Sequence, residues 1–122
     1  MQYNGNRKPI ASYKDLEVYR SAYSASIRVI KEILPKLPAS EKFDLVDQLR
    51  RSTKAIPRLI AEGYAKRHQK LGFQKYLVYA LAESNETEVG LQQCADIYGI
   101  KCPDLISLYE RIGKQIYRLS EV

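Results

Sequence analysis

Residues 48–67 read QLRRSTKAIPRLIAEGYAKR and combine an apolar row with a dense group of basic side chains. At 100° per residue, Arg50, Lys54 and Arg58 fall within one arc of about 80° on a helix, with Arg51 close by. The apolar residues on the other side are Leu49, Ile56, Leu59 and Ile60. This spacing predicts an amphipathic helix that buries its apolar row and carries a basic stripe opposite.

Pro57 interrupts the same helical pattern. Proline lacks an N–H and crowds the carbonyl group four residues earlier, so we expect a kink near residues 53–57. Two helices that meet at Pro57 are the alternative, although the apolar row continues through the proline. Gly63 costs about 1 kcal/mol relative to alanine inside a helix, which favours a role in close packing. We expect Glu62 to form ion pairs with basic residues four positions away.

The net charge of +6 is concentrated in one part of the chain. Residues 50–70 hold seven of the twenty Lys and Arg residues and one of the fourteen acidic residues, so the remaining chain is neutral. These seven residues, called the basic segment below, are Arg50, Arg51, Lys54, Arg58, Lys66, Arg67 and Lys70. Such a patch attracts polyanions, and basic residues spaced by four can follow phosphates without reading bases.

Charge pairing within the protein is the alternative explanation for the basic segment. Four acidic residues and no basic residue lie between Lys75 and Lys101, namely Glu83, Glu86, Glu88 and Asp96. They could pair with the basic segment within one subunit or across an interface, although four acids cannot neutralise seven bases. Glu86 adjoins small core positions, so we expect it to pair with an arginine of the preceding helix.

Three further helices and no strand are predicted from the rest of the chain. The first begins at Ser12 or Asp15 and ends near Leu34, before Pro35 and Pro38. Its expected apolar stripe contains Leu16, Tyr19, Tyr23, Ile27, Ile30, Ile33 and Leu34. Ser40 is the expected N-cap of the second helix, whose apolar row begins at Phe43.

The third helix has the most regular pattern, beginning after a turn at residues 67–72. Its heptad row is Phe73, Leu77, Ala80, Ser84, Thr87, Leu91, Cys94 and Tyr98. The small and polar middle of this row allows close helix approach or a side-chain hydrogen bond, and Gly99 is the expected C-terminal cap. The fourth helix opens at Pro103 and buries Leu105, Leu108, Ile112, Ile116 and Leu119.

Length and composition predict one domain at residues 13–122 behind a flexible tail at residues 1–12. Four helices with short connections fit an all-α, antiparallel up-down-up-down four-helix bundle. No signal peptide or membrane-length apolar run is present, and two unclustered cysteines favour reduced thiols, so we expect a cytoplasmic protein.

The chain contains no group of residues typical of an active site. His68 is the only histidine, Cys94 and Cys102 form no metal or redox motif, and no phosphate loop or nucleophile elbow occurs. We therefore predict no catalytic residue, no metal site and no cofactor. Of the ten tyrosines, Tyr19, Tyr23, Tyr76 and Tyr98 fall on or near core stripes. Tyr64 and Tyr79 are expected to be buried with the hydroxyl group at an edge, and base stacking beside the basic segment is the alternative.

Four motifs carry a family resemblance: YKDLEVY at 13–19, LVDQLRRSTKAIPRLIAEGY at 45–64, FQKYLVYAL at 73–81 and ESNETEVGLQ at 83–92. Over residues 12–119 the chain resembles the bacterial four-helix-bundle proteins encoded within intervening sequences of large-subunit ribosomal RNA. That family is related to the accessory variability protein of diversity-generating retroelements. Many relatives carry Asn two residues after the proline, where this chain has Leu59.

The resemblance implies a ring-like homopentamer, a basic surface that binds nucleic acid, and no catalytic residues. It leaves open whether the chain belongs to the retroelement branch or to the intervening-sequence branch. We predict a non-enzymatic protein that binds the RNA or DNA backbone through the basic segment. The alternative is a protein-interaction scaffold, such as an accessory subunit of a retroelement reverse transcriptase. An enzyme built on the bundle is a third reading, which no convergent set of titratable residues supports.

Overall fold

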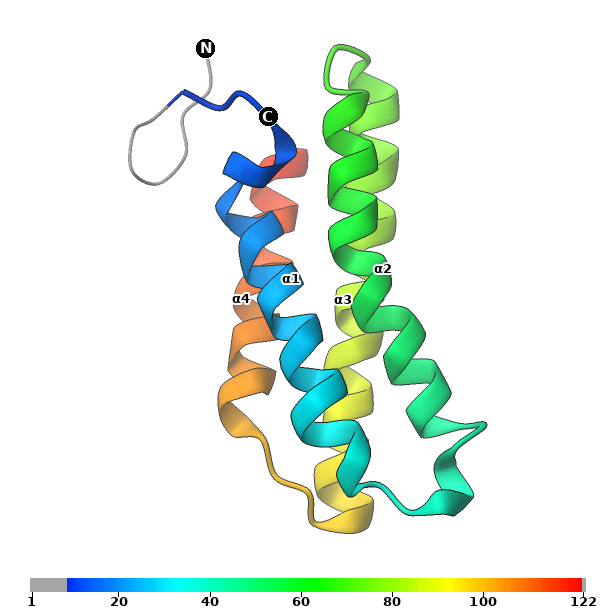
Figure 1. The fold of residues 1–122 in the computed structure, drawn as a ribbon. Helices are drawn as coiled ribbons and strands as arrows, with labels where there is room; N and C mark the ends of the chain where they lie inside the picture. The colour runs from blue at the N-terminus through cyan, green and yellow to red at the C-terminus, as the bar shows by residue number, and fades with distance from the viewer. Residues whose placement is uncertain (1–8, 122) are drawn as a thin grey trace.

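The computed structural model of the chain describes residues 9–121. Its four long helices are α1 (Glu17–Arg28), α2 (Leu45–Ala65), α3 (Lys70–Tyr98) and α4 (Pro103–Ser120) (Figure 1). Short helical turns are η1 (Tyr13–Asp15), η2 (Val29–Ile33), η3 (Leu34–Lys36) and η4 (Ala39–Glu41). The predicted tail at residues 1–12 lies mostly outside the described residues.

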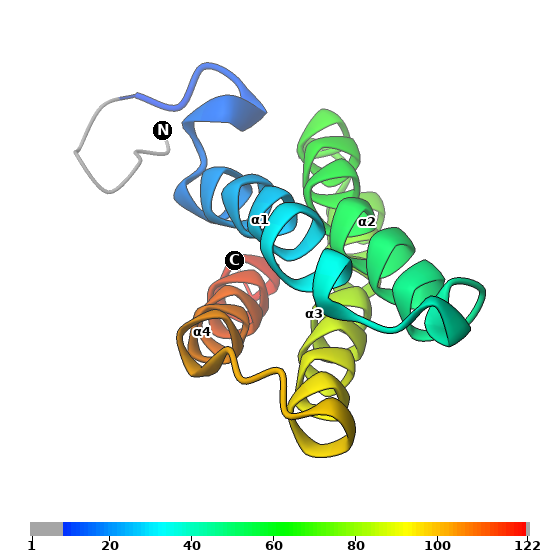
Figure 2. The same ribbon diagram turned by 60° about the horizontal axis from the view of Figure 1, so that its bottom comes forward.

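The four helices surround one apolar core (Figure 2). Helix α1 contacts α2 and α4, and α3 contacts the same two helices, so α1 and α3 lie diagonally opposite each other. Every long helix contributes fully buried side chains, including Ala22, Leu49, Leu77 and Ile112. The prediction of an all-α protein with four helices is therefore confirmed. Within residues 9–121, no helix combines the length and apolar character needed to cross a membrane.

Helix α2 runs without interruption through Pro57, so the alternative of two separate helices is wrong. Figure 1 shows α2 changing direction about halfway along, as expected for an internal proline. The predicted start of this helix is also wrong, because Ser40 lies in η4. Instead, the backbone N–H of Leu45 donates to Oε1 of Glu41 at 3.2 Å, which caps the first turn. Phe43 precedes the helix and is 87% exposed.

Helix α1 begins later than predicted. Ser12 caps the short turn η1 in a capping box with Asp15, but Leu16 then adopts an extended conformation and α1 starts at Glu17. The predicted apolar stripe is only partly buried, since Tyr23 is 53% and Ile27 39% exposed. The buried row of α1 proper contains the smaller side chains Val18, Ala22, Ala25 and Ser26. Small residues let α1 approach its neighbours closely and turn the larger tyrosine outward.

The structure of α3 agrees with most of its predicted pattern. All of the predicted heptad row is buried except Tyr98, whose exposed hydroxyl donates to Glu41. Gly99 adopts φ +69° and caps the helix, since residues with a side chain rarely adopt this left-handed conformation. The turn before α3 is shorter than predicted, and Gly72 lies within the helix.

Helix α4 starts at Pro103 as predicted and buries Leu105, Ile112 and Ile116. Leu108 and Leu119 are only half-buried. The fully buried residue that the sequence pattern missed is Tyr109, whose hydroxyl is hydrogen-bonded to the hydroxyl of Thr53 on α2.

Buried hydroxyl groups join α2, α3 and α4. Thr87 Oγ1 donates to Ser52 Oγ at 2.8 Å, and Ser84 Oγ donates to the carbonyl oxygen of Tyr109 at 3.4 Å. Beside these bonds, Leu49 of α2 packs directly against Gly90 of α3, where an added Cβ would lie 2.6 Å from Leu49 Cδ2. The predicted side-chain hydrogen bond at the small and polar middle of the α3 row is therefore confirmed, and Gly90 adds a close approach outside that row.

Gly63 permits a second close approach between α2 and α3. A Cβ added to Gly63 would lie 3.2 Å from Tyr76 Cβ, which is tighter than most side-chain contacts. The expected packing role of this glycine is confirmed. Together with Gly90, it lets α2 and α3 lie close together along much of their length.

Candidate nucleic-acid interface

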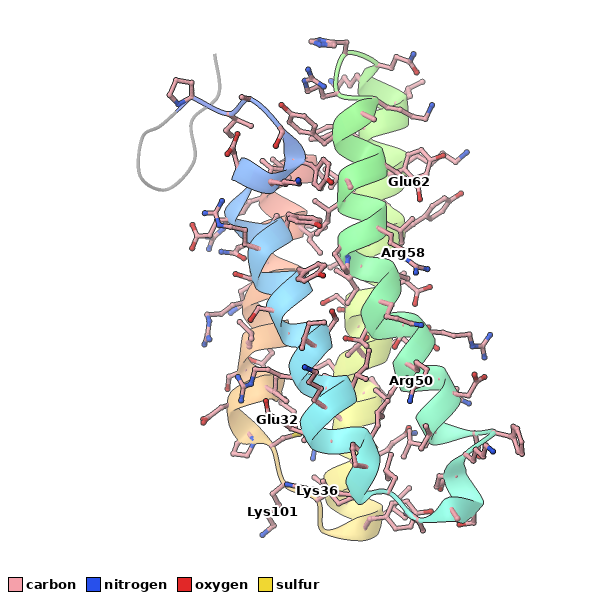
Figure 3. The ribbon with its side chains drawn as sticks, in the orientation of Figure 1. Glu32, Lys36, Arg50, Arg58, Glu62 and Lys101 are labelled. Atoms are coloured by element: carbon pink, nitrogen blue, oxygen red, sulfur yellow. The ribbon has the colours of Figure 1, made fainter. Side chains whose placement is uncertain are left out.

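The basic segment follows α2 and continues into the turn at its end. Figure 3 labels Arg50, Arg58 and Glu62 in succession along α2. Arg50, Arg51 and Arg58 are exposed, whereas Lys54 is half-buried. At 1.5 Å per residue, Arg50 and Arg58 lie about 12 Å apart along the helix axis. These positions agree with the outward side predicted for this part of α2.

The remaining three residues occupy the end of α2, the turn and the start of α3. Lys66, Arg67 and Lys70 are all exposed, and His68 between them is exposed as expected. At 100° per residue, Lys66 lies about 80° around α2 from Arg58, and exposed Glu62 lies between them in the same row. The basic segment therefore has two parts, one along α2 and one at the turn.

Only one residue of the basic segment forms an ion pair within residues 9–121. Arg51 Nη2 lies 3.0 Å from Asp47 Oδ2, one turn earlier on the same exposed surface. Such exposed pairs contribute only about 0–1 kcal/mol. Arg67 is held differently, because its guanidinium stacks 4.3 Å from the ring centroid of Tyr64 and donates to the Tyr64 carbonyl oxygen at 3.1 Å.

The alternative, pairing between α2 and the acids of α3, is not formed at ion-pair distance in this part of the chain. Glu86 is exposed instead of pairing with an arginine, and Glu62 forms no ion pair with its basic neighbours. Burial and the adjacent Glu86 raise the pKa of Glu83 above its ordinary value, although nearby Arg51 lowers it. Burial and Glu110 raise the pKa of Glu88.

A groove opens on the side of α2 that faces η1 and α1. Its volume is about 360 Å³. Lys54 and Arg58 line it from α2, together with Pro57 and Ala61, and three tyrosine rings line it from the other side. The rings belong to Tyr13, Tyr19 and Tyr23. The structure thus brings two residues of the basic segment together with exposed aromatic surface.

Sequence patterns miss this groove because they place Tyr19 and Tyr23 in the core stripe of the first helix. A signal was nevertheless present, since Val18, Ala22 and Ala25 provide a second, smaller row on the same helix. Tyr64, one of the two tyrosines considered for base stacking, is buried, while Tyr79 is 47% exposed.

The groove on the opposite side of α2 has a different composition. It lies between α2 and α3 and measures about 320 Å³. Apolar and amide side chains and the hydroxyl group of Ser52 line it, with Glu86 as its one charged residue. Helix α2 is therefore flanked by a groove with cations on one side and by a groove with an acid on the other.

Other reactive side chains do not form a site within residues 9–121. No group of three His, Cys, Asp or Glu residues there could hold a metal ion. Cys94 and Cys102 are free and buried. Burial raises the pKa of Cys94 to about 11 and also raises that of Cys102, so both are protonated thiols near neutral pH.

Comparison with protein-family models matches residues 14–120 to the 23S rRNA-intervening sequence protein. The chain belongs to this family. Neither the comparison with curated proteins nor that with solved structures gave a match. The family match covers all four long helices, and the resemblance identified from the sequence motifs is confirmed.

Proposed function

We propose that this member of the 23S rRNA-intervening sequence family binds the sugar–phosphate backbone of RNA or DNA without catalysing a reaction. The basic segment would make the contacts, because phosphate groups are best neutralised by Lys and Arg side chains. The observation that carries the proposal is that only Arg51 of these seven residues is in an ion pair within residues 9–121. The other six keep their charge available for a polyanion.

A ring-like homopentamer of up-down-up-down bundles is the assembly proposed for this function. An exposed apolar row on α3, formed by Leu71, Val78, Ala82 and Val89, supports self-association. These side chains recur at the spacing of one helix face, and an exposed apolar row of this kind is typical of an interface. Five copies would multiply modest contacts with a single polyanion. Sedimentation equilibrium measures the mass, and a monomer would contradict the assembly.

Charge reversal tests the binding surface. The variant Arg50→Glu, Lys54→Glu, Arg58→Glu should lose affinity for a fluorescent RNA or DNA oligonucleotide by on the order of 100-fold at low salt. A matched control reverses Lys31, Lys36 and Lys101, three exposed lysines outside the basic segment, with the same change in net charge. Equal affinity of the two variants would contradict the proposed surface.

A protein-interaction scaffold, such as an accessory subunit of a reverse transcriptase, is the second candidate. Exposed Phe43 and Ile97, which lie outside the α3 row, favour a protein partner in addition to self-association. A pull-down before and after nuclease treatment separates the two candidates. A partner that stays bound after nuclease treatment would support the scaffold, and one that is lost would support nucleic-acid binding.

A further inference from the structure

The groove between α1 and α2 contains a cluster of three tyrosine rings. The centroids of Tyr13 and Tyr19 lie 4.8 Å apart in an edge-to-face arrangement, and those of Tyr19 and Tyr23 lie 6.0 Å apart with an interplanar angle of 35°. Tyr23, at 53% exposure, is the most accessible of the three. Tyr23 therefore has free surface, and it lies against Tyr19, which in turn contacts Tyr13.

Cations surround this cluster. Lys54 and Arg58 line the groove from α2, and a neighbouring hollow of about 330 Å³ that shares Tyr19 and Tyr23 is lined by Lys14 and Arg20. Nη1 of Arg20 donates to the carbonyl oxygen of Lys14 at 2.9 Å, which holds this arginine beside the start of α1.

The lining of both hollows contains no acidic residue. Asp15, which is close in the sequence, accepts hydrogen bonds from the backbone N–H groups of Ala11 and Ser12. Exposed Glu17 lies on α1 outside the lining. The rings are thus flanked by positive charge from both walls of the groove.

We infer that this groove binds unpaired bases of single-stranded nucleic acid, with a base stacked on Tyr23 and the flanking phosphates near Lys54 and Arg58. Aromatic faces beside cations are the features that single-strand-binding surfaces combine. A duplex offers only its phosphates to such a groove, because its bases are stacked on one another. This inference rests on the proposed function and adds that the protein prefers single strands to duplexes.

A fluorescence anisotropy titration tests the inference with three ligands at one salt concentration. They are a 20-nucleotide single strand, the matched duplex, and a single strand of equal length in which every base is removed. The wild-type protein should bind the base-containing single strand most tightly. Tyr23→Ala should weaken that binding about fivefold or more, as expected for loss of one stacked base. Binding of the duplex and of the base-free strand should change less than about twofold, since phosphate contacts dominate both.

Two further variants separate stacking from loss of surface area. Tyr23→Phe keeps the ring and should bind like the wild type. Tyr117→Ala removes a tyrosine of similar exposure, 56%, from α4 outside the groove and should leave every affinity unchanged. Circular dichroism melting checks that each variant folds.

The results distinguish failure of the inference from failure of the proposed function. Equal binding of all three ligands, unaffected by Tyr23→Ala but abolished by the charge reversal, would overturn the inference alone. If the protein bound none of the three ligands, both the inference and the proposed function would be overturned. A lower mass of Tyr23→Ala in sedimentation equilibrium would instead assign the groove to contact between copies of this chain, which also overturns the inference.

Discussion

Helix α2 packs differently against its neighbours on its two sides. Toward α3 and α4, Thr53 bonds to Tyr109, Ser52 bonds to Thr87, and Leu49 lies against Gly90. A groove lies on each side of α2. The groove toward α1 is lined by tyrosine rings and the cations of Lys54 and Arg58, whereas the groove toward α3 has Glu86 as its one charged residue.

The difference shows how side-chain size can give one side of a helix a role in stability and the other side a role in ligand binding. Hydroxyl groups and glycine let two backbones approach closely, which excludes water and satisfies each buried polar atom. Large rings and long cations cannot pack that closely, so they keep a surface that a ligand can reach. We call the side of α2 with the buried hydroxyl bonds and the contact between Leu49 and Gly90 the closed side, and the side that faces α1 the open side. Substitutions on the closed side should therefore change stability, and those on the open side should change binding.

High pH should have the largest effect, and it acts on the closed side. Burial raises the pKa of Tyr109 from its ordinary value of 10 to about 12, although the hydrogen bond to Thr53 lowers it. The unfolded chain thus releases this proton at a lower pH than the folded protein does. The contribution of Tyr109 to the free energy of unfolding is therefore complete below pH 10 and is lost as the pH rises from 10 to 12. The two-unit shift corresponds to about 3 kcal/mol.

Urea unfolding of the wild type and of Tyr109→Phe between pH 9 and pH 12 measures this loss. The variant lacks the titrating hydroxyl and leaves Thr53 without its partner, so it should be less stable by about 1–2 kcal/mol at pH 9. The difference should shrink and reverse as the pH rises. If the free energies of unfolding of the two proteins changed in parallel with pH, Tyr109 would be ionised as easily in the folded protein as in the unfolded chain.

Gly90→Ala should have the next largest effect, and it tests the contact between α2 and α3 at Leu49. The new Cβ would lie 2.6 Å from Leu49 Cδ2 and 3.1 Å from its Cγ, so the buried Leu49 side chain would have to shift. Overpacking of this kind costs about 1–3 kcal/mol, part of which is offset by the higher helix propensity of alanine. Thermal unfolding measures the loss, while affinity for nucleic acid should stay unchanged.

Gly113→Ala is the matched control for Gly90→Ala. Its added Cβ would lie 3.5 Å from Leu81 Cδ1 of α3, which is an ordinary van der Waals distance. This variant should gain up to about 1 kcal/mol. If the two alanine variants lost equal stability, the closed side would not depend on the contact between Leu49 and Gly90.

Arg58→Gln should have the smallest effect and tests the open side. Loss of one phosphate contact reduces the slope of log affinity against log salt by about 1. Lys101→Gln removes an exposed charge outside the basic segment and should leave the slope unchanged. The slope is measured by anisotropy titration at several salt concentrations, and equal slopes for both variants would remove Arg58 from the proposed surface.

Much of the fold could be predicted from local patterns. The heptad row of α3, the Pro103 start of α4 and the Gly99 cap each depend on residues within a few turns of one another. The start of α2 could not be predicted in this way, because Glu41 rather than Ser40 supplies the capping oxygen. Ser40 is a suitable N-cap in residue type, but the chain around it forms η4, and the helix begins only after Asp44.

The candidate site was predictable in residue type but not in arrangement. The concentration of positive charge in residues 50–70 follows from the sequence. The ion pair of Arg51 with Asp47 is a contact between residues four apart, whereas the expected pairs with α3 acids depend on how two helices are rotated. That rotation left the α3 acids beyond ion-pair distance of α2.

The sequence by itself determined the four helices, the family and the excess charge near α2, because periodicity, caps and charge are properties of neighbouring residues. Only the tertiary structure decided which apolar residues of α1 are buried. Both Tyr23 and Ala22 suit a helix interface, but the alanine row fits the space beside the other helices and the tyrosine does not. Close packing selects the smaller row, and that choice places Tyr23 in the groove beside Lys54 and Arg58.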